Sequence, residues 1–183
     1  SCGMKKITRI SIEEHDTTVA AEVDEAYQSE VSKYWKKRQL GSTTATTQFG
    51  LASAGEAVAD CGVDMTTYDG SKVGVIFGVI GTVYEDAERE KKNNITLKKM
   101  PNGLPALIAL KYGFQGPNFS LSTACASSAY AITLGKQLIE SGICDMVVAG
   151  GTSGVVSHDT ISGFNQLLAM SVNPDPDTAS RPF

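Results

Sequence analysis

The feature that most constrains the fold is a strand–helix–strand succession between residues 118 and 149. Residues 118–123 alternate apolar side chains with serines, which is a strand pattern, and the small residues of 124–141, closed by Gly142, favour a helix. Residues 145–149 (DMVVA) form a continuous apolar strand, as do residues 72–77 (KVGVIF). Because such strands need cover on both faces, the sequence predicts a layered α/β fold.

Further elements can be assigned on either side of this core. Apolar residues at helical spacing predict a helix over 46–61, and a shorter one over 106–111 ends at Gly113. Residues 85–93 are charged and favour an exposed helix. Residues 7–35 are polar and irregular, which indicates a peripheral region of loops or short strands.

The net charge and the hydropathy pattern argue against several kinds of partner and location. The net charge of −4 gives no reason to expect nucleic acid or an anionic membrane as a partner. The apolar runs are too short to cross a bilayer. The first residues, SCGMKK, lack the apolar core of a signal peptide, which favours the cytoplasm.

Four widely spaced cysteines argue against a zinc site and a disulfide framework: Cys2, Cys61, Cys125 and Cys144.

Cys125 lies where the strand over 118–123 gives way to the following helix. Free N–H groups and the helix dipole stabilise negative charge at a helix start, so a thiolate there is suited to nucleophilic catalysis and the same groups can bind an oxyanion. The alternative is that Cys125 is a small buried apolar residue, as most free cysteines are.

Several segments, in order along the chain, resemble ketosynthases of the thiolase-like superfamily, the β-ketoacyl-acyl carrier protein synthases. The active-site region is represented by STACASSA (122–129), preceded by YGFQGPN (112–118) and followed by DMVVAGG (145–151). The other segments are TTQFGLASAGEAVADCGV (46–63), KVGVIFG (72–78), MPN (100–102), GFNQLLAMS (163–171) and ASRPF (179–183).

The resemblance implies the thiolase-like layered α-β-α fold, of which residues 1–183 would be an incomplete N-terminal half. The family's first strand and helix and its whole C-terminal half would be absent. That second half carries two catalytic histidines and a supporting lysine. The two histidines here, His15 and His158, fall at neither catalytic position.

The reaction implied is acyl transfer from acyl carrier protein to Cys125, followed by decarboxylative Claisen condensation with a malonyl group in fatty acid or polyketide synthesis. The phosphopantetheine arm of the carrier protein would deliver the substrates, with no permanently bound cofactor. Two alternatives stay open: a condensing enzyme that uses CoA thioesters, and a non-catalytic half-subunit that retains the cysteine. The resemblance also implies a dimer, with residues 118–122 paired across its two-fold axis.

Five further residues are candidates by the same resemblance. The basic residues Lys36, Lys37 and Arg38 would help to dock the acidic carrier protein, although a solvated charged surface is an equal alternative. Met100 and Ile108 would lie near the acyl pocket or the dimer contact, with ordinary core packing as the equal alternative.

Overall fold

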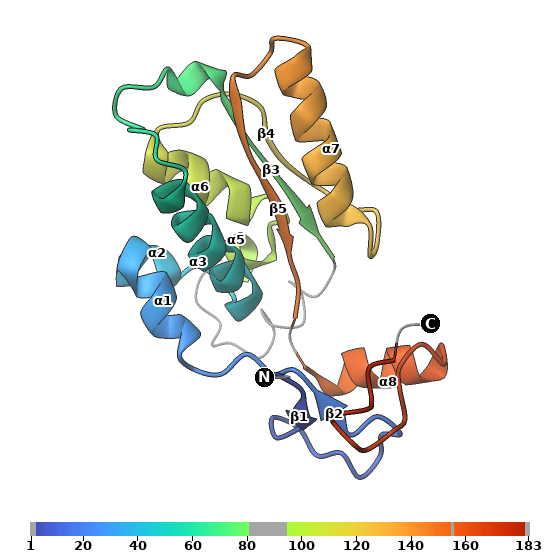
Figure 1. Cartoon of the computed structure of the whole chain (residues 1–183). Coiled ribbons are helices and arrows are strands. Elements are labelled where there is room, and N and C mark those ends of the chain that lie inside the picture. Colours follow the sequence, from blue (N-terminus) through green and yellow to red (C-terminus); the bar gives the residue numbers. More distant parts are fainter. Residues whose placement is uncertain (1–2, 81–94, 155, 182–183) are drawn as a thin grey trace. The chain divides into compact units, whose positions relative to one another are not determined.

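A computed structural model describes residues 3–80, 95–154 and 156–181 of the chain (Figure 1). The charged segment 85–93 lies outside the described residues. The chain divides into two compact units. Unit 1 comprises residues 1–24 and 154–183, and unit 2 comprises residues 25–153.

The centre of unit 2 is a three-stranded parallel sheet. Its strand order is β4 (Asn118–Leu121), β3 (Val73–Val79) and β5 (Met146–Thr152). Ile76 of β3 is in register with Phe119 on one side and Ala149 on the other. Every residue of β3 is buried, as its continuous apolar sequence requires for a central strand covered on both faces.

Helices cover both faces of this sheet. Helix α7 (Ser127–Glu140) packs against β3 and β5. Helices α3 (Ala45–Asp60) and α6 (Gly103–Tyr112) also contact the strands, and Figure 1 shows them on the opposite side of the sheet from α7. The predicted layered α/β fold is therefore confirmed.

Local sequence explains where the covering helices begin and end. The Thr44 side chain accepts a hydrogen bond from the Thr47 N–H at the start of α3. Gly113 ends α6 in the left-handed conformation, with φ 73°. Three short elements also belong to the unit: α2 (Lys37–Leu40), the 3₁₀ turn η1 (Gly70–Lys72) and α5 (Ile95–Lys99).

Helix α1 (Tyr27–Tyr34) corrects the expectation that residues 7–35 are only loops or short strands. It packs against α3, and Val31 and the adjacent Trp35 are buried in the core. The Trp35 Nε1–H donates a hydrogen bond of 2.9 Å to the Leu51 carbonyl oxygen. The helix escaped prediction because most of its residues are polar, and its few apolar contacts come from tertiary packing.

Unit 1 combines a short antiparallel ribbon with one helix. Strands β1 (Lys5–Lys6) and β2 (Val19–Ala20) form the ribbon. Helix α8 (His158–Gln166) begins at Ser157, whose side chain accepts from the Thr160 N–H. The His15 Nε2 and His158 Nδ1 atoms lie 2.9 Å apart, at hydrogen-bond distance. Across the described parts of both units, no helix has the length and apolarity needed to cross a membrane.

Candidate functional site

The chain makes a strained turn between the end of β4 and the start of α7. Ala124 has φ 51°, in the left-handed region that residues with a Cβ rarely adopt. Cys125 follows it directly, and Ala126 precedes the first residue of α7. The cysteine therefore lies on a strand-to-helix turn, as the sequence predicted, although the helix begins at residue 127 rather than 124.

Hydrogen bonds of Ser127 close this turn. The Ser127 side chain is buried, with 3% of its surface exposed. Its Oγ accepts from the Thr123 N–H at 2.9 Å and donates to the Ala124 carbonyl oxygen at 2.6 Å. The Ser127 N–H donates to the same carbonyl at 3.1 Å. The two residues before Cys125 are thus tied to the first residue of α7.

Two glycines allow α7 to approach the sheet closely at this point. A Cβ on Gly78 of β3 would lie 2.7 Å from the Cβ of Ser127, and a Cβ on Gly151 of β5 would lie 3.0 Å from the Cβ of Ser128. The first distance is one that real Cβ atoms essentially never show, and the second is tighter than nine in ten real Cβ contacts. The start of α7 is therefore held directly on the sheet.

A pocket of about 180 Å³ opens where the carboxyl ends of β3 and β5 meet this turn. Its lining includes Cys125 and is rich in small and hydroxyl-bearing side chains: Gly78, Ile80, Ala124, Ser127, Ser128, Gly151, Thr152 and Ser153. The first turn of α7 also directs backbone N–H groups that lack intrahelical acceptors toward this end of the helix. The Cys125 thiol and the amino-terminal end of α7 are therefore brought together at this pocket.

The cysteines of the described residues occupy two kinds of environment. The thiols of Cys125 and Cys61 are exposed, whereas Cys144 is 1% exposed. Burial raises the pKa of the Cys144 thiol above its usual range, which keeps it neutral. Within this chain the Cys125 thiol is therefore accessible, unlike that of Cys144. Among the described residues, no group of three or more His, Cys, Asp or Glu side chains could hold a metal ion.

Met100 and Ile108 lie in different environments from Cys125. Ile108 is fully buried in the core of unit 2, in agreement with the packing alternative. Met100 is 43% exposed and lines a second pocket of about 240 Å³ between α3, α5 and α6, together with Leu97, Leu107 and Leu110. None of the residues that line this pocket also lines the pocket at Cys125.

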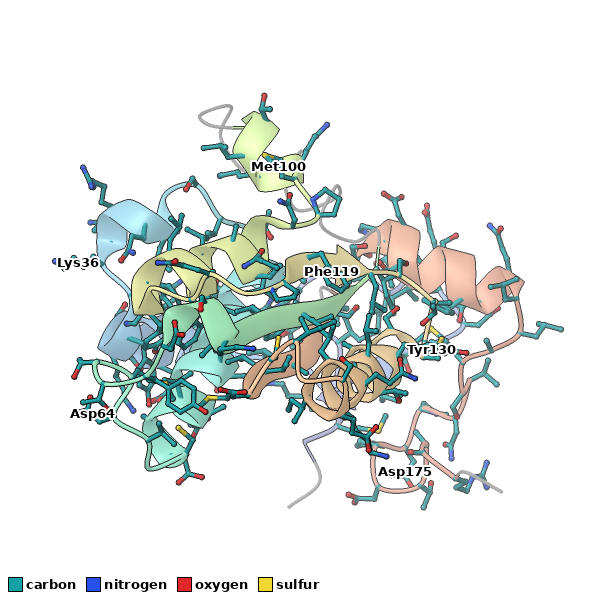
Figure 2. All side chains as sticks on the ribbon, turned by 90° about the horizontal axis from the view of Figure 1, so that it is seen from above. Lys36, Asp64, Met100, Phe119, Tyr130 and Asp175 are labelled. Atoms are coloured by element: carbon teal, nitrogen blue, oxygen red, sulfur yellow. The ribbon has the colours of Figure 1, made fainter. Side chains whose placement is uncertain are left out.

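The basic residues Lys36, Lys37 and Arg38 are all exposed at the start of α2. Figure 2 shows Lys36 at the opposite side of unit 2 from Tyr130, which belongs to the first turns of α7. The basic residues are therefore remote from the turn at Cys125.

Sequence patterns drew attention to Cys125 but not to the residues that contact its turn. Ser127 and Gly78 belong to segments that were recognised as helix and strand, yet neither stood out within its segment. Ala124 gave no signal because alanine has no preference for the left-handed region. Their joint role depends on the meeting of β3 and α7, which are separated by about fifty residues in sequence.

Comparison with known proteins shows which family has this architecture. Residues 4–183 match the family model "Beta-ketoacyl synthase, N-terminal domain". The 3-oxoacyl-(acyl-carrier-protein) synthase 2 of Staphylococcus aureus is 29% identical over 99% of this chain and 47% of its own length. The chloroplastic 3-oxoacyl-(acyl-carrier-protein) synthase II of Arabidopsis thaliana is 31% identical over 99% of this chain and 36% of its own length.

Solved structures show the same fold. The ishigamide ketosynthase/chain length factor superposes with a TM-score of 0.75 at 21% identity, covering 95% of this chain and 45% of its own. A type II PKS acyl-carrier protein in complex with its ketosynthase gives a TM-score of 0.63 at 18% identity, covering 74% and 42%. The chain thus spans less than half the length of these relatives. From the family match over nearly its whole length, the chain belongs to the β-ketoacyl synthase family and corresponds to that family's N-terminal domain.

Proposed function

We propose that this chain forms the nucleophile-bearing part of a β-ketoacyl synthase. The observation that carries the proposal is the exposed Cys125 thiol on a left-handed turn, at the start of α7 and in the lining of a pocket. Such a position presents the sulfur atom to an incoming thioester while the helix start supports the negative charge that develops on its carbonyl oxygen.

In the first step, the Cys125 thiolate attacks the carbonyl carbon of an acyl thioester on the phosphopantetheine arm of acyl carrier protein. A new carbon–sulfur bond forms to Cys125, the carbon–sulfur bond to the arm breaks, and the sulfur of the arm leaves as a thiolate that takes up the proton released by the Cys125 thiol. In the second step, a malonyl thioester loses CO₂, and the resulting carbanion attacks the Cys125 thioester. A carbon–carbon bond forms and the Cys125 thiolate is released.

The second step needs groups that bind the malonyl thioester and stabilise its carbanion. His15 and His158 both belong to unit 1, where they face each other. Since neither falls at a catalytic position of the family, we assign carbanion stabilisation to histidines of the C-terminal half that the resemblance implies. The free thiols of Cys61, Cys125 and Cys144 agree with a reducing compartment such as the cytoplasm.

A dimer is part of the same proposal. Strand β4 is at an edge of the sheet, and all four of its residues are only partly buried. On the neighbouring α7, Tyr130 is 57% exposed and Ile132 is 58% exposed. Exposed apolar side chains beside an unpaired strand edge are features of a surface that another chain covers. Sedimentation of the complete protein, with Tyr130→Lys as a variant expected to weaken association, tests this assignment.

Intact-protein mass spectrometry tests the acyl transfer. The complete protein is incubated with acyl-acyl carrier protein, beside a Cys125→Ala variant and a Cys61→Ala control, which removes the exposed thiol at the end of α3. We expect an acyl-sized mass increase that persists in Cys61→Ala and disappears in Cys125→Ala. An increase with acyl-CoA alone would assign the CoA-dependent alternative, and no increase from either donor would favour a non-catalytic subunit.

A further inference from the structure

We propose that Ser127 is a positioning residue for Cys125: its hydroxyl holds Ala124 in the left-handed conformation that presents the thiol to its pocket. This inference rests on the proposed role of Cys125 as nucleophile. Ser127 lines the pocket at Cys125, but its hydroxyl is engaged with the turn on both sides, so it acts through the backbone of the turn rather than by contact with a substrate. It therefore sets how fast the thiol reacts without changing which thioester is bound.

The hydrogen bonds of Ser127 span both residues before the cysteine. Its Oγ receives the Thr123 N–H and donates to the Ala124 carbonyl oxygen, so a single hydroxyl joins the peptide group before Thr123 to the one after Ala124. The relative orientation of these two planar groups depends on the backbone torsions of Thr123 and Ala124. The bridge therefore restricts φ and ψ at Ala124.

The conformation needs such support because Ala124 has a Cβ atom. In the left-handed region this atom approaches the following carbonyl group, so an alanine there is disfavoured unless the surroundings impose it. The Ala124 φ of 51° is one of two positive φ values among the described non-glycine residues. Without the Ser127 hydroxyl, the turn would relax toward negative φ and Cys125 would rotate.

Packing leaves no simple replacement for the hydroxyl. Ser127 is 3% exposed and lies against Gly78, whose added Cβ would be 2.7 Å from the Ser127 Cβ. Solvent therefore reaches the Ser127 side chain poorly, and water is not a ready substitute for its hydroxyl when that group is removed. A small side chain with a donor and an acceptor meets the requirement.

The test uses a cycle of three variants of the complete protein: Ser127→Ala, Ala124→Gly and the double variant. The readout is the rate of Cys125 alkylation by iodoacetamide, divided by that of Cys61 in the same molecule. Ser127→Ala should lower the ratio roughly tenfold, because two hydrogen bonds of the turn are lost. Glycine adopts positive φ readily, so Ala124→Gly should restore most of the ratio in the Ser127→Ala background.

Ser141→Ala is the matched control, since Ser141 Oγ also bonds to the carbonyl three residues earlier, at the far end of α7. It should leave the ratio unchanged. In acyl transfer, Ser127→Ala should lower kcat and leave KM for the carrier protein unchanged. A loss that Ala124→Gly does not rescue, or no loss at all, would overturn the proposal.

Folding and function are separated by the same variants. If Ser127→Ala fails to fold by circular dichroism, Ala124→Gly should restore folding together with reactivity, and an unfolded double variant would overturn the proposal. The alkylation ratio does not depend on acyl transfer. A rescued ratio in a protein that accepts no acyl group would therefore support the positioning role while rejecting the proposed function.

Discussion

Gly78 of β3 lies directly against Ser127 at the start of α7. A Cβ at Gly78 would be 2.7 Å from both the Cβ and the carbonyl oxygen of Ser127. Because β3 is buried along its whole length, it cannot move aside to make room. The central strand therefore supports the turn that carries Cys125 by direct contact.

Gly78→Ala should disturb this contact. The added methyl group must displace either β3 or the first turn of α7, so we expect the free energy of unfolding to fall by about 1–3 kcal/mol. The alkylation rate of Cys125 should fall as well, whereas that of Cys61 should not. Urea unfolding followed by the fluorescence of Trp35, the single tryptophan, measures the stability change.

Gly163→Ala is the control for that substitution. Gly163 lies within α8, with no atom within 4 Å of the place that a Cβ would occupy, so alanine should leave stability unchanged or raise it by about 0.4–1 kcal/mol. Equal destabilisation by both variants would mean that the contact between Gly78 and Ser127 has no special role.

The sequence allowed the covered sheet and the position of Cys125 to be predicted because both leave a local signal. Apolar β-branched runs indicated β3 and β5, and the change of periodicity after residue 123 indicated the strand-to-helix junction. Helix α1 leaves little local signal, since only its contact with α3 requires Val31 to be buried. The conformation of Ala124 likewise comes from the Ser127 hydroxyl.

Alkaline pH should destabilise the fold through Cys144. Burial raises the pKa of its thiol in the folded state above the unfolded value, which is about 8.5 for a free thiol. The neutral thiol thus contributes stability that is fully present below the unfolded pKa and is lost as pH rises through the folded pKa. The free energy of unfolding should therefore decrease with pH above this value.

Urea unfolding in reducing buffer across this pH range measures the slope. Cys144→Ala should be less stable than the parent near neutral pH, because it leaves a cavity, but its alkaline slope should be shallower. Cys61→Ala, which removes an exposed thiol, should keep the parent slope. An unchanged slope in Cys144→Ala would contradict the assignment.

Charge reversal at Lys36, Lys37 and Arg38 tests the proposed docking of acyl carrier protein. If these exposed residues attract an acidic partner, a triple substitution to Glu should raise KM for acyl-acyl carrier protein by roughly tenfold at low salt, with less effect at high salt. The rate of Cys125 alkylation should not change. Lys5→Glu and Lys6→Glu, exposed on β1 of unit 1, reverse two charges at another place and serve as controls, to be compared with the matching double variant Lys36→Glu and Lys37→Glu.

The distance of Lys36 from the first turns of α7 makes this a demanding test. A carrier protein bound at the basic residues would have to present its arm across unit 2. An unchanged KM in the triple variant would therefore assign the three residues to a solvated surface and move carrier docking to another face of the enzyme.

A substitution at Met100 tests whether the pocket between α3, α5 and α6 binds the acyl tail or whether Met100 only packs against its neighbours. This pocket is lined mainly by apolar side chains, and its volume of about 240 Å³ gives room for part of an acyl chain. If the pocket receives the acyl tail, Met100→Trp should lower kcat/KM for the longest acyl groups by roughly tenfold or more and leave the shortest unaffected. Competition between acyl donors of different length measures this ratio.

Val63→Trp, at a partly exposed residue that does not line the pocket, is the control. An equal loss for short and long donors would instead mean that Met100 packs against its neighbours, because a packing defect does not discriminate between acyl lengths.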